Sequence, residues 1–292
     1  MARDMPDHRR MKAPYVSAIL IFISLASVAS AQVVFSAAGA NAAAIQSTVD
    51  TFRTALGALN PNVAGSVGSG RREINWDGVP DAFSAPNNLP ANFFNVNSPR
   101  GVVFSTPGTG FQVSATAASG TPVQFGNIDP SYPNFFEPFS PQRLFTALGS
   151  TITDVSFFVP GTTSPALTTG FGAVFSDVDL ANTSSLQFFD ASNSSLGTFF
   201  VPGIAGSDTL SFLGVSFPSA NISRVRITSG NQVLAAGNIA LDLVVMDDFV
   251  YGEPRASTSV PDAGATGVWF AFSLGLLLFG SRFRMTQRQA NR

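Results

Sequence analysis

The stretch ISRVRIT (Ile222–Thr228) alternates apolar and polar side chains and decides the fold class. Val225 and Ile227 fall on one side of an extended chain, whereas Arg224, Arg226 and Thr228 fall on the other. Successive side chains of a β-strand point to opposite faces of its sheet. The pattern therefore predicts a half-buried strand with one face on a core and the other in solvent.

Short segments of similar character lie on both sides of this stretch. Eight further strand candidates are residues 101–104, 110–115, 152–159, 170–178, 185–189, 196–201, 210–217 and 239–252. The polar segment DASNSS (190–195) lies between two Phe-rich candidates and predicts a hairpin. Short strands separated by Gly, Pro, Ser and Asn predict an all-β fold, an antiparallel jelly-roll-like β-sandwich.

One segment before the strands has a helical period instead. Within residues 38–59, apolar side chains recur at steps of four and three residues, which places them on one face of a helix. These apolar positions are Ile45, Val49, Phe52 and Leu56. Gly57 and Pro61 are expected to end the helix. The resulting organisation is a signal peptide (1–31), a helix with a flexible linker (32–70), a β-sandwich domain (71–253), a linker with a sorting motif (254–264) and an apolar helix with a basic tail (265–292).

The charge of the central region excludes some partners. Eight arginines, no lysine and 16 acidic residues lie between Gln32 and Asp262, which gives a net charge of −8. A field of this sign disfavours nucleic acid. The chain has no cysteine, and its one histidine, His8, lies in the predicted signal peptide. Disulfides, thiolate nucleophiles, Ser-His-Asp triads and His-ligated metals are therefore excluded from the mature protein.

Two long loops, residues 72–100 and 127–143, are rich in Asn, Pro and aromatic residues, and long ordered loops often build sites. Their aromatic side chains are candidate ligand contacts: Trp76, Tyr132, Phe135 and Phe136. Oxygen-bearing side chains also cluster along the chain, and calcium prefers oxygen ligands. The candidate calcium ligands are Asn75, Asp77 and Asp81 in the first loop, Asp177 and Asp179, and Asp247 and Asp248.

Other roles for these carboxylates stay open at this point. Asn75, Asp77 and Asp81 also fit a turn in which side chains satisfy their own backbone. The remaining aspartates also fit pairing with an arginine, such as Arg143 or Arg224, or plain exposure to solvent. No cofactor is required by the sequence, and a structural calcium ion is the one candidate.

The N-terminus predicts export. Arg9, Arg10 and Lys12 precede the apolar stretch 18–28, and Ala29-Ser30-Ala31 forms a small-x-small cleavage site for signal peptidase. An apolar stretch of about 11 residues is too short to span a hydrocarbon core of ~30 Å. We therefore expect the mature chain to begin at Gln32.

The C-terminus carries a second apolar run, residues 265–280, followed by Arg282 and Arg284. Its asymmetric flanks predict a membrane helix that keeps the arginines in the cytoplasm and the folded domain outside. The run follows VPDAG, whose residues are Val260, Pro261, Asp262, Ala263 and Gly264.

This tail resembles the PEP-CTERM class of bacterial sorting signals, in its Val-Pro-Asp-Ser-Gly variant, with Ala263 in place of Ser. The resemblance implies processing by an exosortase, a membrane cysteine protease-transpeptidase, in a Gram-negative bacterium that makes exopolysaccharide. It implies delivery to the cell surface or extracellular matrix, with transient anchoring by residues 265–280. The body of the chain resembles exported bacterial proteins of uncharacterised type, which adds no activity.

These observations favour a non-enzymatic surface or matrix protein. The first alternative is a carbohydrate-binding, lectin-like module that uses the loop aromatics. A weaker alternative is a glycosidase that works through paired carboxylates, since such chemistry needs neither His nor Cys.

Overall fold

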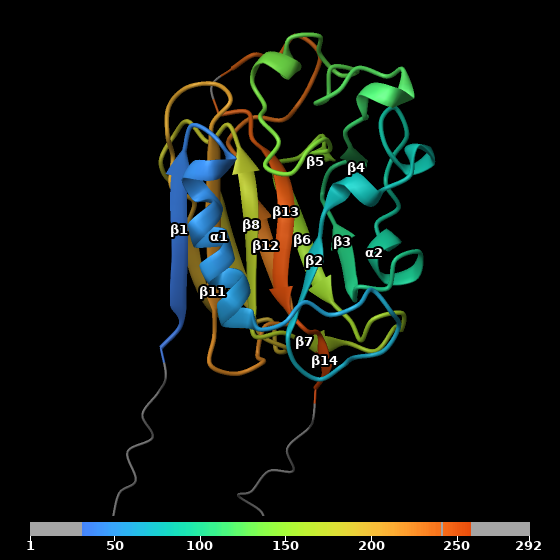
Figure 1. The fold of residues 1–292 in the computed structure, drawn as a ribbon, viewed down its shortest axis with the longest axis vertical. Coiled ribbons are helices and arrows are strands. Elements are labelled where there is room, and N and C mark those ends of the chain that lie inside the picture. Colours follow the sequence, from blue (N-terminus) through green and yellow to red (C-terminus); the bar gives the residue numbers. More distant parts are fainter. Residues whose placement is uncertain (1–30, 241, 258–292) are drawn as a thin grey trace, which may run out of the picture. The chain divides into compact units, whose positions relative to one another are not determined.

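The computed structural model describes residues 31–240 and 242–257, which form two antiparallel sheets packed face to face (Figure 1). The larger sheet, in spatial order, consists of β1 (Val33–Gly39), β11 (Leu210–Ser216), β8 (Gly170–Ser176), β13 (Val245–Gly252), β5 (Phe145–Leu148) and β4 (Gly110–Val113), with β2 (Arg71–Ile74) also paired to β13. The smaller sheet consists of β10 (Ser195–Phe200), β9 (Ser185–Phe189), β12 (Arg224–Thr228), β6 (Ile152–Phe157) and β3 (Val102–Ser105).

Short elements complete the fold. They are the pair β7 (Ala166–Leu167) and β14 (Arg255–Ala256), the helices α1 (Ala42–Leu56) and α2 (Phe93–Val96), and the 3-10 turns η1 (Trp76–Gly78), η2 (Asp81–Phe83), η3 (Ala117–Ser119) and η4 (Tyr132–Asn134). The predicted all-β antiparallel sandwich is confirmed. Its jelly-roll connectivity stays a prediction.

Strand β12 has the two faces that its alternation predicts. Val225 and Ile227 are fully buried between the sheets. Arg224 and Arg226 point outward and both pair with Asp154 of β6, at 2.7 and 2.8 Å. The β9–β10 hairpin is also confirmed, since Phe200 pairs with Ser185 in antiparallel register.

Helix α1 covers the outer face of the larger sheet over β1, β11 and β8 (Figure 1). Its buried residues are the four that the period predicts: Ile45, Val49, Phe52 and Leu56. The helix begins later than expected because Asn41 caps it, accepting a hydrogen bond from the Ala44 amide at 3.2 Å. Phe52 lies against bare backbone, where a Cβ on Gly172 would approach its ring within 2.8 Å.

Strand β1 was not predicted. Residues 32–70 were assigned to a helix and a linker, but Val33–Gly39 pairs along its whole length with β11. The N-terminal part of the described chain therefore belongs to the sandwich.

Three central strands of the larger sheet run between the same two ends of the molecule. One end, which holds a pocket and is called the pocket end, is defined by Thr169, Phe217 and Glu253, which flank β8, β11 and β13. The acidic end is defined by Asp177, Asp208 and Asp242, which flank the same strands on the other side. Strands of seven or eight residues separate the two ends by roughly 25 Å at ~3.3 Å per residue.

Across residues 31–240 and 242–257, the structure has no helix long and apolar enough to span a membrane. The predicted signal sequence up to Ser30, the sorting motif at Val260–Gly264 and the apolar run 265–280 lie outside the described residues.

Candidate functional site

The carboxylates of the first predicted calcium loop hold backbone amides instead. Asp77 accepts hydrogen bonds from the amides of Gln142 and Arg143, the latter at 2.8 Å. Asn75 caps η1 by accepting from the Asp77 amide at 2.9 Å. Asp81 pairs with the Arg143 guanidinium at 2.5 Å. The loop 72–100 thereby binds the loop 127–143. The turn chemistry is the alternative that the sequence left open for this loop, whereas the pairing of Asp81 with Arg143 was not predicted.

Asp247 and Asp248 lie at a bulge in β13, where the register with β8 shifts between Met246 and Phe249. Asp247 accepts from the amides of Phe139 and Ser140, at 2.7 and 3.1 Å. The Ser140 hydroxyl donates to Asp248 at 2.9 Å, and Asp248 also pairs with Arg53 of α1 at 3.3 Å. These carboxylates therefore fasten the second loop to the sheet.

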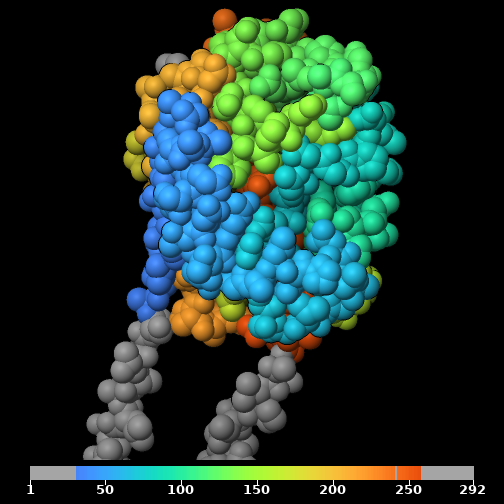
Figure 2. All heavy atoms as spheres, viewed as in Figure 1, coloured from blue at the N-terminus to red at the C-terminus, as the bar shows by residue number. Residues whose placement is uncertain are grey.

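Both of these carboxyl groups are cut off from water. Their exposed fractions are 0% for Asp247 and 3% for Asp248. Burial raises the pKa of both groups, and the neighbouring Asp248 raises that of Asp247 further. Figure 2 shows blue, cyan and green segments covering most of this face of the molecule, with a few orange-red atoms visible between them.

Asp177 and Asp179 belong to a separate cluster at the acidic end, with Asp208 and Asp242. Asp242 accepts from the amides of Asp179 and Leu180, at 3.0 and 3.1 Å. Asp177 Oδ1 and Asp242 Oδ2 are buried and have no hydrogen-bond partner among the described residues. Burial, followed by the charges of Asp179, Asp208 and Asp242, raises the pKa of Asp177 to about 7.

These positions correct the expected calcium sites. Within the part of the chain that the structure describes, no group of three or more His, Cys, Asp or Glu side chains is placed to hold a metal ion. The physical reason at Asn75, Asp77, Asp81, Asp247 and Asp248 is that their oxygens already accept from amides, a hydroxyl or a guanidinium.

The burial of Asp177 near other carboxylates predicts a pH dependence of stability. Its carboxyl group has a pKa of about 7 in the folded state against an ordinary 3.8, so the folded state binds the extra proton between these values. The contribution of this one group to stability is therefore greatest below about pH 4, falls as the pH rises from about 4 to 7, and is lost above about pH 7. We expect Asp177→Asn to raise the melting temperature at pH 8 by about 2–4 °C, the effect of roughly 1 kcal/mol once solvent screening is allowed for.

The measurement is a thermal melt of both chains at pH 4 and pH 8, in the presence of a chelator so that no cation masks the charge. Asn tolerates the left-handed backbone at this position, where φ is 70°. Asp190→Asn is the matched control, because Asp190 lies in the exposed β9–β10 hairpin and its Oδ1 accepts from two local amides. A lower melting temperature of Asp177→Asn than of the parent at pH 8 would contradict the prediction.

The expectation of a ligand platform in the long loops is also corrected. Trp76 has no exposed surface and stacks on Phe145 with ring centroids 4.1 Å apart. Tyr132 and Phe136 are fully buried in a smaller cluster, with Phe135 packed partly buried against it. These rings are apolar core beneath the loops and offer no open face to a sugar.

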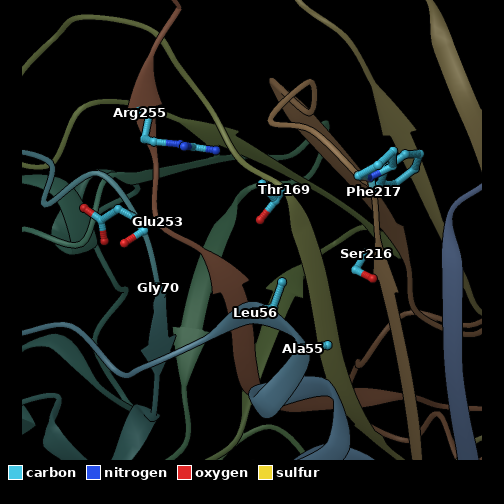
Figure 3. Close-up of a pocket in the computed structure, with 10 residues that line it drawn as sticks. Ala55, Leu56, Gly70, Thr169, Ser216, Phe217, Glu253 and Arg255 are labelled. Carbon is cyan, nitrogen blue, oxygen red and sulfur yellow. The ribbon is translucent and has the colours of Figure 1, made fainter. Parts of the chain in front are cut away.

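The structure instead presents a pocket at the pocket end, with a volume of about 280 Å³ (Figure 3). It lies where the C-terminus of α1 meets the loop 69–70, the residue before β8, the end of β11 and the segment after β13. Its lining residues are Ala55, Leu56, Ser69, Gly70, Thr169, Ser216, Phe217, Pro218, Glu253 and Arg255.

A buried ion pair fixes one wall of this pocket. Arg72 donates to both carboxylate oxygens of Glu253, at 2.7 and 3.0 Å. Glu253 also accepts from the Asn60 side chain at 2.8 Å and from the Val67 amide at 3.1 Å. The predicted flexible loop 60–70 is thereby tied to the end of β13, and the Glu253 charge is fully neutralised.

Sequence reasoning named none of the pocket residues as part of a site, and Leu56 was named only as an apolar position of the helix. They come from five separated segments of the chain. Each segment, considered alone, has the sequence of a turn or of the end of a helix or strand. Arg255 gave the one local indication of a site, because it is the arginine at the start of the linker 254–264 and follows the buried end of β13.

Comparisons with known proteins add little. No family model matches the chain, and no curated protein matches it. A solved structure of the enzymatically active domain of bacteriophage CBA120 tailspike protein 4 is similar at 13% identity and a TM-score of 0.28, over 56% of this chain and 20% of that one. A Bacillus subtilis glycoside hydrolase family 43 arabinoxylan arabinofuranohydrolase gives 15% identity and a TM-score of 0.26, over 52% of this chain and 27% of that one. The matches span about a fifth and a quarter of those proteins and say nothing about activity here.

Proposed function

We propose that this chain is an exported, non-enzymatic cell-surface or extracellular-matrix protein of a Gram-negative bacterium. The observation that carries the proposal is the presence, in one chain, of a signal sequence, the VPDAG motif at 260–264, the apolar run 265–280 and an arginine-rich end. Its processing partners are signal peptidase and an exosortase, and exopolysaccharide is the expected neighbour at the surface.

The described domain supports a structural or binding role. Its pair of buried carboxylates that are neighbours in sequence, Asp247 and Asp248, lies beneath the backbone of Phe139 and Ser140, where no sugar reaches them. The carboxylates of Asp177 and Asp242 at the acidic end are buried as well. A glycosidase needs both carboxyl groups beside the scissile bond. The arrangement therefore favours a role in holding loops over the glycosidase alternative.

The sorting signal makes a testable prediction. A chain truncated after Asp262 lacks the apolar run and the arginines. We expect the full chain to fractionate with the membrane or cell surface and the truncated chain to appear in the culture medium. Immunoblots of the membrane, surface and medium fractions measure the ratio.

A chain in which Arg282 and Arg284 are both changed to Gln is a matched control, since it keeps the apolar run but weakens its orientation signal. We expect the fraction of this control chain in the culture medium to lie between the fractions of the full and truncated chains. Equal release of the full and truncated chains would show that the tail retains nothing, and the delivery proposal would fail.

The pocket supports a second candidate function, a carbohydrate-binding module. Hydroxyl groups and one guanidinium line a cavity beside the half-buried Phe217 and the exposed Pro218. Sugars bind where polar groups and an apolar surface meet. The ligand contacts of this candidate therefore move from the loop aromatics to the pocket end.

A further inference from the structure

The pocket end differs in charge from the rest of the domain. Three arginines lie there, of which Arg71 pairs with Glu73 at 2.7 Å and Arg72 with Glu253 at 2.7 Å. Arg255 forms no ion pair with the residues that the structure describes, and its one hydrogen bond runs to the Gly68 carbonyl at 3.1 Å. An otherwise acidic domain therefore has a free positive charge at this pocket.

Glu253 does not cancel that charge. Its two oxygens accept four hydrogen bonds, two of them from Arg72, so its negative charge is already balanced inside the protein. In Figure 3 the Glu253 side chain points away from Arg255, which extends across the space toward Thr169 and Phe217. Among the described lining residues, the Arg255 guanidinium is therefore the one charged group that no ion pair balances.

The remaining polar side chains of the pocket are hydroxyls that have no partner among the described residues. Ser69, Thr169 and Ser216 line the cavity, and their hydroxyls make no hydrogen bond to other described residues. A hydroxyl is both donor and acceptor, which matches the hydroxyls of a sugar. Their positions are set by backbone contacts, such as the Phe217 amide donating to the Thr169 carbonyl at 2.7 Å.

One wall of the pocket is apolar. The Phe217 ring packs against Phe188, with centroids 5.4 Å apart, and Pro218 lies beside it at the exposed rim. The part of Phe217 that stays exposed and the exposed Pro218 give the C–H face of a sugar an apolar surface to cover. The volume of about 280 Å³ is just below that of most ligand pockets, which span roughly 300–1,000 Å³, and so suits a ligand no larger than one sugar unit.

We propose that this pocket binds an acidic sugar unit of a polysaccharide, with Arg255 holding the carboxylate and Ser69, Thr169 and Ser216 holding the ring hydroxyls. The inference rests on the carbohydrate-binding candidate and names its ligand class. A guanidinium and a carboxylate form charge-assisted hydrogen bonds, which are about twice as strong as neutral ones. The charge therefore selects acidic over neutral sugars.

The test uses the full chain in a detergent without a sugar headgroup, with binding measured by calorimetry or ligand-observed NMR. Glucuronic acid is the probe, glucose is the neutral comparison and inorganic phosphate is the anion comparison. We expect glucuronic acid to bind at least about tenfold more tightly than either, the factor that one charge-assisted hydrogen bond provides.

Variants locate the site. Arg255→Gln is expected to weaken glucuronic acid binding by about tenfold or more and to leave glucose unchanged. Thr169→Val, which keeps the side-chain shape, is expected to weaken both sugars. Arg226→Gln is the matched control, because Arg226 lies on the outer face of the other sheet and pairs with Asp154. A thermal melt of each variant confirms folding.

Three outcomes overturn the inference. Equal affinity for glucuronic acid and glucose removes the role of the charge but keeps the carbohydrate-binding candidate. Phosphate binding as tightly as glucuronic acid indicates a simple anion site. Unchanged binding by folded Arg255→Gln and Thr169→Val chains places the sugar elsewhere. None of these affects the delivery proposal, which fractionation tests separately.

Discussion

Glu253→Ala is expected to lower the free energy of unfolding by about 3–5 kcal/mol, the cost of leaving a buried charge unpaired. Arg72 is fully buried, and the Glu253 side chain is 1% exposed. Arg72 also donates to the carbonyls of Val63, Gly65 and Pro99, so it cannot turn outward without breaking those contacts.

Chemical denaturation of the parent and the variant measures this loss. The matched control is Arg226→Ala, which removes the exposed partner of Asp154 and is expected to cost at most about 1 kcal/mol. Arg72→Met with Glu253→Met replaces the whole pair by apolar side chains and is expected to recover part of the loss. A single Glu253→Ala chain as stable as the Arg226→Ala chain would show that the pair does not hold the loop 60–70.

Trp76→Ala is expected to cost about 3–5 kcal/mol, the range for removing a large aromatic side chain from a core. Its ring stacks on Phe145 at 4.1 Å and meets the edges of Phe94 and Phe249 at 5.4 and 5.1 Å. The ring therefore joins the first long loop, α2 and the larger sheet.

Phe200→Ala is the control, because Phe200 is 52% exposed on β10 and should change stability by less than about 0.5 kcal/mol. Trp76→Phe should lie between the two. Sugar binding measured on the same chains distinguishes a role of Trp76 in core packing from a role in contacting a ligand. A Trp76→Ala chain that melts like the parent but loses a sugar would restore the surface role that the sequence suggested.

Much of the fold follows from local periodicity. The alternation at Val225 and Ile227 predicts one buried face of a strand, and the steps from Ile45 to Leu56 predict one buried face of a helix. Both predictions are confirmed. Strand β2 could not be found in this way, because its buried face includes Arg72. Burial of an arginine depends on Glu253, which is 181 residues further along the chain.

The candidate sites were harder to predict for a related reason. An aspartate that accepts from a distant amide and one that awaits a ligand look alike in sequence, as Asp77 and Asp247 show. Trp76 in an Asn/Pro-rich loop looks exposed because sequence does not show that the loop folds over the sheet. Pocket residues such as Thr169 and Arg255 meet only through the register of β8, β11 and β13.

The direction of those three strands has a further consequence. Val33 pairs with Ser216, and β14 ends at Ala256, so both ends of the described chain leave from the pocket end. If the proposed tail tethers the domain, the acidic end, where Asp208 is exposed and Asp179 is partly exposed, faces outward on every copy. Each copy also carries the net charge of −8 counted between Gln32 and Asp262. Neighbouring copies then present like charges to one another, and repulsion over a Debye length of about 8–10 Å sets their spacing. We expect a dense layer of this protein to swell in low salt and contract in high salt, as thickness measurements on a coated surface would show.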